Sequence, residues 1–205
     1  MPSRQERAAQ TEAALKEAAK RVFARTGYLN AKITDITTEA GRAAGSFYLH
    51  FDGKDELLEA LLIDMLDEGH RRAALPGHDP DFSKVDAVRF HVAGYWDFVT
   101  GHREVILALS QAAMVSDHFA RRQRELMAPM FAEFAGHLGY VARAGGTLPG
   151  DPAAVTDVIV AAMSGYAFTW LNQPEPRPTA DEAIDLVSAF IVHGVMGLPP
   201  RPASC

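Results

Sequence analysis

Residues 33–58, ITDITTEAGRAAGSFYLHFDGKDELL, decide the fold of the N-terminal part of the chain. The pattern predicts two short helices, 33–40 and 43–51, joined by a tight turn. Gly41 gives this turn the permissive backbone that it needs. A short turn between two helices is the geometry that lets the second helix enter a DNA groove.

The second of these helices has two unlike faces. Phe47 and Phe51, spaced i and i+4, are expected to pack into a core. The opposite face offers small residues that let the backbone approach base edges, and longer side chains that reach phosphate. We expect DNA contacts from Ala44, Gly45, Ser46, Tyr48, His50 and Lys54. The alternative is a helical corner in a bundle, with Tyr48 and His50 as ordinary surface residues.

The charge distribution is compatible with a nucleic-acid partner. Residues 1–54 hold nine Lys and Arg against six Asp and Glu, a balance of +3, so the remainder must carry −9 to give the net −6. A mildly basic head on an acidic body can present one face to phosphate. A window this small can also reach +3 by chance.

The rest of the 205-residue chain, in which 48% of residues are hydrophobic, also predicts helices. The expected ranges outside the quoted stretch are 5–26, 52–75, 82–100, 103–115, 117–144, 152–171 and 180–197. The fold class is therefore all-α, with an N-terminal three-helix helix-turn-helix head on a larger helical bundle. We predict a DNA-binding domain at 1–52, a ligand-binding and dimerisation domain at 53–198, and a flexible tail at 199–205.

The motif Gly45-Ser-Phe-Tyr-Leu-His-Phe51, followed by Lys54-Asp-Glu-Leu57, resembles the signature of the TetR family of transcriptional regulators. The resemblance covers about Thr11 to Leu62. It implies a homodimeric regulator, usually a repressor, that a small molecule releases from its double-stranded DNA operator. Matched position by position, it implies base or backbone contacts from Ala44, Gly45, Ser46 and Tyr48, and phosphate contacts from Tyr48, His50 and Lys54.

The chain departs from the family pattern at two helix starts. Lys32 stands where the family usually has a capping Thr or Ser, so Asn30 or Thr34 would have to cap the first short helix. Ala43 stands where a Ser often caps the second, a loss of ~1 kcal/mol. Lys32, Thr34 and Arg42 join the expected DNA contacts, with phosphate for Lys32 and phosphate or a base for Arg42.

Aromatic and Met side chains in the body offer an apolar pocket for a small-molecule effector. Most such residues belong to a core. The five that we expect to contact the ligand are Tyr95, Trp96, Met127, Phe131 and Tyr166.

Two C-terminal helices are expected to pair with their symmetry mates in a homodimer. The residues assigned to this interface are Val158, Ala162, Gly165, Val187, Ile191 and Val195. The alternative is that the same faces are buried within one chain. A dimer agrees with DNA recognition, because two heads meet two half-sites.

Other functional classes have no support in the sequence. No nucleophile–base pair or phosphate loop is visible, so we expect no enzyme. The histidines lack i, i+4 pairs and Cys partners, so we expect no metal site and no cofactor. The sequence contains no run of 18 apolar residues, so it predicts no membrane span. A single cysteine, Cys205, and a charged N-terminus favour the cytoplasm.

Overall fold

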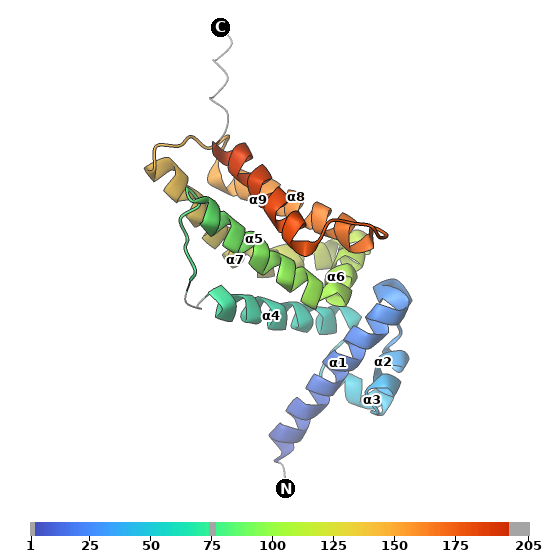
Figure 1. Ribbon diagram of the computed structural model, residues 1–205. Coiled ribbons are helices and arrows are strands. Elements are labelled where there is room, and N and C mark those ends of the chain that lie inside the picture. Colours follow the sequence, from blue (N-terminus) through green and yellow to red (C-terminus); the bar gives the residue numbers. More distant parts are fainter. Residues whose placement is uncertain (1–2, 74–76, 197–205) are drawn as a thin grey trace. The chain divides into compact units, whose positions relative to one another are not determined.

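The computed structural model describes residues 3–73 and 77–196, and within them every regular element is a helix (Figure 1). The helices are α1 (Arg4–Asn30), α2 (Ile33–Glu39), α3 (Ala44–Phe47), α4 (Lys54–Ala73), α5 (Val85–Gly101), α6 (Arg103–Val115), α7 (Asp117–Arg143), α8 (Pro152–Asn172) and α9 (Ala180–Met196). The all-α prediction is confirmed. The largest difference is in α3, which ends at Phe47 and continues as a turn over 48–50, where a helix to Phe51 was expected.

The chain forms two compact units. Unit 1 comprises residues 1–70 and 102–126, and unit 2 comprises residues 71–101 and 127–205. Compactness therefore divides the chain within α4 and α7, not after residue 52. The assignment of DNA contacts to 1–52 and of ligand and dimer contacts to 53–198 stays a prediction. The predicted tail, 199–205, lies outside the described residues.

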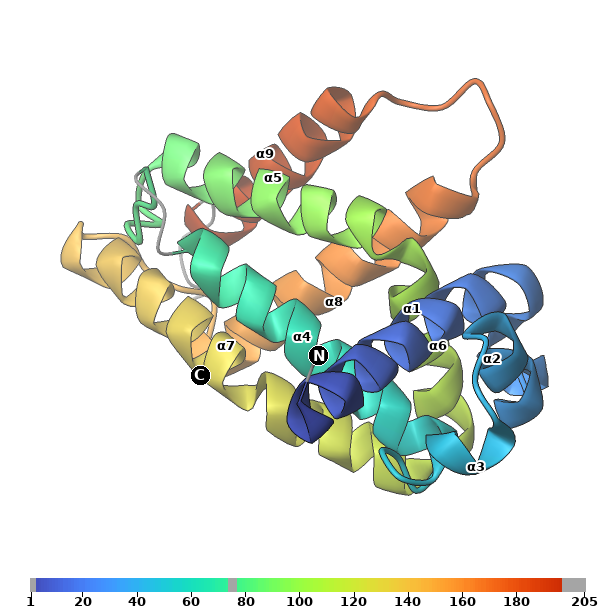
Figure 2. The ribbon, with the colours of Figure 1, turned by 90° about the horizontal axis from the view of Figure 1, so that it is seen from below.

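Unit 1 is organised around α1, which contacts both α2 and α6, while α2 contacts α3 (Figure 2). The apolar face of α1 buries Leu15 and Val22 completely. Ile36 of α2, Phe47 of α3 and Leu57 of α4 are also fully buried. Because each short helix contributes a large apolar side chain, the core of unit 1 fixes the two helices that flank the turn.

The end of α1 departs from the expected stop at Gly27. Gly27 has φ +72°, which breaks the helix, and one further turn then runs to Asn30. The Gln111 side chain of α6 accepts a hydrogen bond from the Tyr28 backbone N–H, at 2.7 Å. An amide group that the break leaves without a helical partner is thus satisfied by a side chain of another helix.

Unit 2 places α5 against both α8 and α9. Its core contains Trp96 of α5, Met163 of α8 and Ile184 of α9. The predicted helix starts are confirmed: Asp151 accepts hydrogen bonds from the backbone of the first turn of α8, and Thr179 pairs with Glu182 in a capping box before α9.

Helix α8 is unusually apolar. It is long and apolar enough to cross a membrane by length and composition alone, with a mean hydropathy of 1.4 over its best window. The sequence analysis did not predict this property of α8, because polar residues interrupt its apolar run. Only 33% of that window is buried in this chain. Core helices pass the same test, and an exposed apolar face is also what a subunit interface needs.

Candidate functional site

The turn between α2 and α3 is closed by backbone hydrogen bonds that require a glycine. Gly41 has φ +63°, and its N–H donates to the Thr38 carbonyl at 3.0 Å. The Arg42 N–H donates to the Thr37 carbonyl at 2.9 Å. This pair of bonds is a Schellman motif, which satisfies the last carbonyls of α2 and reverses the chain. The sequence prediction of a tight turn at Gly41 is confirmed.

The segment from Ala44 to Leu49 presents one buried side and one exposed side. Phe47 is fully buried, whereas Tyr48 is 60% exposed and Leu49 is 83% exposed. Ala44 and Gly45 are exposed as well, and a Cβ added at Gly45 would meet no atom within 4 Å. We call residues 42–49 the recognition segment. Its outward side combines small residues with two long side chains, as close approach to a groove requires.

Sequence reasoning missed Leu49. It lies in the turn that follows α3 and is 83% exposed. Its neighbours Tyr48 and His50 are predicted to contact DNA because they carry polar groups, and Leu49 carries none. The signal was available: Leu49 cannot share the buried face of Phe47 and Phe51, which are four residues apart.

Ser46 is half-buried, and its hydroxyl proton already takes part in a hydrogen bond. The hydroxyl donates to the Ala43 carbonyl at 2.7 Å, so its remaining capacity is as an acceptor. Ala43 provides no side-chain cap for α3, as the sequence predicted. A base contact by Ser46 would therefore be with a donor such as the amino group of adenine or cytosine.

Lys32 and Thr34 are exposed at the start of α2, and Arg42 is exposed in the turn. Lys32 makes no side-chain cap, and neither Asn30 nor Thr34 replaces it: the Lys32 N–H instead donates to the Asp35 carboxylate at 3.1 Å. Within the described residues, neither Lys32 nor Arg42 forms an ion pair. Both cations are therefore available to phosphate. His50 is half-buried, with its ring 6.3 Å from the ring of Phe51.

Lys54, the first residue of α4 as predicted, makes contacts within the chain that the sequence did not indicate. Its ammonium donates to the carbonyl oxygens of Tyr28 and Ala31, at 2.8 and 2.7 Å, and lies 4.5 Å from the Tyr28 ring centroid. Burial lowers the pKa of Lys54, and the nearby Asp55 carboxylate opposes that effect in part. Asp55 also accepts a hydrogen bond from the Tyr28 hydroxyl. The structure thus ties Lys54 to the end of α1. The sequence suggests a phosphate contact for the same side chain.

An ion-pair cluster joins α1 to α2. Glu39 pairs with Arg21 at 2.7 Å and with Arg25 at 3.3 Å. The hydrogen bond from Arg21 is the main cause of the lowered pKa of Glu39. These two arginines pair with an acidic residue of α2. The exposed cations Lys32 and Arg42 are therefore the ones that can face an anion.

Three of the five expected ligand residues meet in unit 2. The Trp96 ring lies 5.8 Å from the Tyr166 ring, and Tyr95 donates to the Ser164 hydroxyl at 3.0 Å. Trp96 Nε1 is buried and has no hydrogen-bond partner among the described residues. An unpaired buried donor costs ~1–3 kcal/mol, so an acceptor on a bound molecule would relieve it. Met127 and Phe131 are half-buried on α7.

One hollow described in unit 2 lies elsewhere. Its volume is about 480 Å³, and it is open to solvent beside the segment before α9, with Arg177, Pro178 and Leu186 among its lining residues. Arg177 is held there by stacking on the Trp170 ring at 4.1 Å. None of the five expected ligand residues lines this hollow.

The expected dimer residues divide into two groups. On α8, Val158 is 68% exposed, Gly165 is exposed and Ala162 is half-buried. On α9 the prediction is wrong: Val187, Ile191 and Val195 are all buried in the core of unit 2. The alternative of burial within one chain holds for that face, because it packs toward α5.

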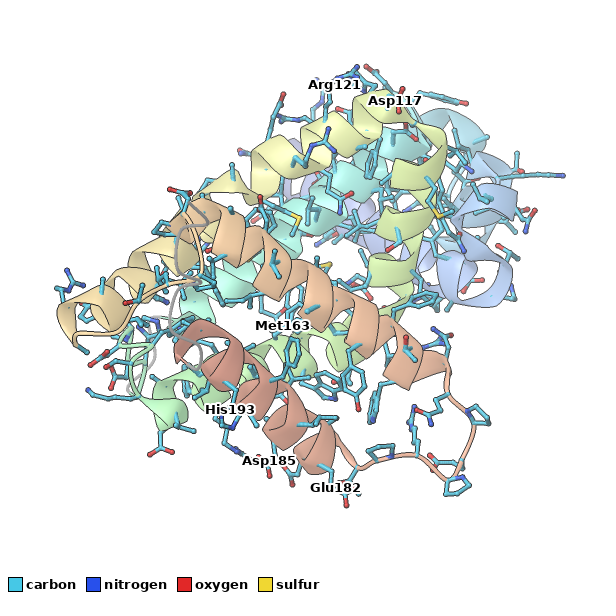
Figure 3. All side chains as sticks on the ribbon, turned by 90° about the horizontal axis from the view of Figure 1, so that it is seen from above. Asp117, Arg121, Met163, Glu182, Asp185 and His193 are labelled. Atoms are coloured by element: carbon cyan, nitrogen blue, oxygen red, sulfur yellow. The ribbon has the colours of Figure 1, made fainter. Side chains whose placement is uncertain are left out.

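The exposed apolar side chains of α9 are instead Leu186 and Phe190, at 56% and 66% exposure. They follow Asp185, which pairs with Arg89 of α5 at 2.7 Å. Figure 3 shows Glu182, Asp185 and His193 along the outer side of α9, and Met163 on α8. Unit 2 therefore exposes apolar side chains on both of its last two helices.

Comparison with known protein families matches two parts of the chain. Residues 15–61 match the model of bacterial regulatory proteins of the tetR family. Residues 97–195 match the C-terminal model of BetI-type transcriptional repressors. The first match contains the turn and the recognition segment, and the second contains α8 and nearly all of α9.

Individual proteins agree with this assignment. The chain is 40% identical over 76 residues to the HTH-type transcriptional regulator TtgR of Pseudomonas putida, an alignment that covers 37% of this chain and 36% of that regulator. A structure of the regulator FadR of Bacillus subtilis in complex with stearoyl-CoA superposes with a TM-score of 0.73 at 17% identity, covering 91% and 99% of the two chains. A TetR-like regulator from a Rhodococcus species gives 0.68 at 21% identity, covering 95% and 98%.

Proposed function

We propose that this chain, which belongs to the TetR family of bacterial regulatory proteins, is a transcriptional repressor. A small molecule would release it from its operator. The observation that carries this proposal is the recognition segment. The buried Phe47 anchors it, and Tyr48 and Leu49 point away from the core beside the exposed cations Lys32 and Arg42. Phosphate contacts by the cations would fix its register, and contacts to base edges would specify the sequence.

Salt dependence of DNA binding tests the first half of this proposal. The probe is the intergenic DNA upstream of the protein's own gene, labelled for fluorescence anisotropy. We expect affinity to fall steeply between about 50 and 200 mM salt, because bound cations release counterions from DNA. Tyr48→Ala should weaken binding without changing thermal unfolding. If the unmutated protein binds neither this DNA nor any sequence selected from random duplexes, the repressor function is wrong.

A homodimer completes the proposal. Val158, Ala161, Gly165 and Phe168 follow one another at intervals of three and four residues, and all four are exposed on α8. A stripe of this period is the pattern by which helices pair. With Leu186 and Phe190 of α9 it would form a four-helix interface with a second copy. The dimer would place two recognition segments on one operator.

The effector is proposed to be a molecule whose apolar part binds near Trp96. Tyr95, Trp96 and Tyr166 supply aromatic walls, and the free Trp96 Nε1 supplies one donor to orient a ligand. Because FadR of B. subtilis is described in complex with stearoyl-CoA, long-chain acyl-CoA is the first class to test. The cytoplasm is the compartment in which both DNA and such effectors are available.

Tryptophan fluorescence offers a direct assay for the effector. Trp96 and Trp170 lie 5.2 Å apart, so a molecule bound beside Trp96 should change the emission of both. Stearoyl-CoA, a free fatty acid and coenzyme A alone separate recognition of the chain from recognition of the nucleotide. A ligand that changes emission should also lower DNA affinity, because differential binding is what couples two sites. Trp96→Phe should reduce the emission response to the part that Trp170 reports, and keep the fold.

A further inference from the structure

We infer that unit 2 contains a binding site for a first-row divalent transition metal ion, formed by His78, His91 and His137. One nitrogen of each imidazole lies within 4.8 Å of the others. His78 lies in the segment before α5, His91 on α5 and His137 on α7, and all three belong to unit 2. The inference does not depend on the proposed DNA binding.

The distances suit a metal with imidazole ligands. Zn–N bonds of 2.0–2.1 Å in a tetrahedron separate neighbouring nitrogens by ~3.4 Å. His78 Nε2 and His91 Nε2 are 3.1 Å apart, close to that separation. The ring centroids of the three histidines are 4.9 to 5.3 Å from one another. The widest separation of the three nitrogens, 4.8 Å, would have to shorten by about 1.4 Å to match.

Hydrogen bonding at two of the rings agrees with ligation. His91 Nδ1 lies 2.8 Å from the Ala87 carbonyl, to which it can only donate. This bond places the proton of a neutral His91 on Nδ1 and leaves Nε2 as an acceptor, which takes the hydrogen bond from His78 Nε2 at 3.1 Å. A bound metal ion would replace that shared proton, and the bond from Nδ1 to a carbonyl is the second-shell arrangement of metal-bound histidines. His137 is 6% exposed, and its Nδ1 is buried with no hydrogen-bond partner among the described residues. A buried nitrogen of this kind calls for an ion or water.

The surroundings hold the rings in place and favour a cation among them. Phe82 and Phe134 pack against the rings of His91 and His137 at 4.8 to 5.9 Å and restrict their movement. The carboxylates of Asp79 and Glu133 add negative potential at His91.

Ligand type selects the class of metal. Three imidazoles without thiolate or carboxylate ligands suit Zn²⁺, Ni²⁺, Co²⁺ or Cu²⁺, whereas Mg²⁺ and Ca²⁺ prefer oxygen. Three protein ligands leave a coordination position for water or for an anionic group of a bound molecule. The sequence concealed the site because the three histidines are separated by 13 and 46 positions. Only the packing of α5 and α7 within unit 2 brings them together.

The experiment uses full-length protein without a histidine tag, treated with chelator and desalted. Co²⁺ is titrated while visible absorption is recorded, and Zn²⁺ is then added to displace it. We expect one Co²⁺ per chain, an absorption band characteristic of nitrogen ligands, and loss of that band at one equivalent of Zn²⁺. Mg²⁺ should neither produce nor displace the signal. Absence of binding at about 100 μM Zn²⁺ by calorimetry would overturn the inference.

Variants locate the site. His78→Gln is the principal variant, because His78 is half-buried in a connecting segment and its loss should leave the core intact. It should weaken Zn²⁺ binding at least tenfold, and His91→Gln should do the same. His193→Gln, an exposed histidine on α9 of the same unit, is the matched control and should bind Zn²⁺ normally. Equal affinity in His78→Gln, His193→Gln and the unmutated protein would also overturn the inference, since binding would then occur elsewhere.

Discussion

Lys54 closes the C-terminal end of α1 by donating to the carbonyl of Tyr28 at 2.8 Å while its ammonium lies over the ring of the same residue. The contact joins the end of α1 to the start of α4, two residues that are 26 positions apart. Helix α4 begins only three residues after Phe51. Because the recognition segment lies between α1 and α4 in the chain, this contact helps to fix both of its ends. These contacts of Lys54 position the head, while a phosphate contact by the same ammonium stays a prediction.

The first prediction separates this role from direct phosphate contact. Lys54→Ala leaves two carbonyls without their donor, so it should lower the free energy of unfolding by ~2 kcal/mol and weaken DNA binding as well. Lys32→Ala, the matched control, removes an exposed cation and should change unfolding by less than ~0.5 kcal/mol. It should still reduce the slope of log affinity against log salt by about one. Urea unfolding and anisotropy measure the two quantities, and equal unfolding of both variants would contradict the positioning role.

The second prediction concerns the break in α1. Gly27→Ala should destabilise the protein by ~1–2 kcal/mol, because an alanine at φ +72° is strained and its Cβ would lie 3.2 Å from Gln111 Oε1. Gly69→Ala, in the interior of α4 with no atom within 4 Å of an added Cβ, should instead stabilise by ~0.5–1 kcal/mol. Thermal unfolding of the two variants should shift in opposite directions. A stabilised Gly27→Ala would mean that α1 continues straight.

The third prediction is a dependence on pH. The pKa of Glu39 is lowered in the folded chain by Arg21 and Arg25, so the folded state holds this proton less tightly than the unfolded state. Its contribution is therefore present above the ordinary glutamate pKa of about 4.3 and is lost as pH falls through the folded value. Glu39→Gln should show a smaller decrease in thermal stability between about pH 5 and pH 3 than the unmutated protein.

A second variant checks the cause of this pH effect. Replacing Arg21 and Arg25 together by Gln removes the charges that lower the pKa of Glu39, so it should flatten the profile to a similar extent. Adding Glu39→Gln to that double variant should then change little, as expected for residues in one network. Independent, additive effects would show that Glu39 acts through other groups.

Local patterns predicted the elements of this fold closely. The Asp151-Pro152 start, the Thr179–Glu182 capping box and the turn at Gly41 all depend on residues within five positions of one another. Such features are encoded by neighbouring side chains and backbone preferences, so the sequence displays them directly. The early end of α3 at Phe47 is the exception, since the chain continues there as a turn over 48–50.

Contacts between distant residues were the part that the sequence could not supply. The family resemblance assigns Lys54 to phosphate, and nothing local indicates that Tyr28 and Ala31 expose carbonyls beside it. The periodic face of Val187 and Ile191 on α9 is equally compatible with a core and with an interface, since both bury apolar groups. Only packing against α5 assigns that face to the core.

The fourth prediction concerns the proposed dimer and depends on that assignment. Leu186 and Phe190 are exposed in the single chain, so replacing both by Ser should leave its fold intact. If these side chains pack against a second copy, the double variant should dissociate at concentrations at which the unmutated protein is a dimer, as measured by sedimentation. Its DNA affinity should fall by at least tenfold, because two linked heads bind with avidity that one head lacks.

Ile191→Ser is the informative comparison for this experiment. Ile191 is 5% exposed and belongs to the core of unit 2, so its replacement should lower stability by ~2–5 kcal/mol. Dissociation without destabilisation is therefore specific to the outer residues. If the Leu186 and Phe190 double variant remains a dimer with unchanged DNA affinity, the interface lies elsewhere. The next candidate would then be the α8 stripe alone, which Val158→Asp would disrupt because a charge cannot be buried there without a partner.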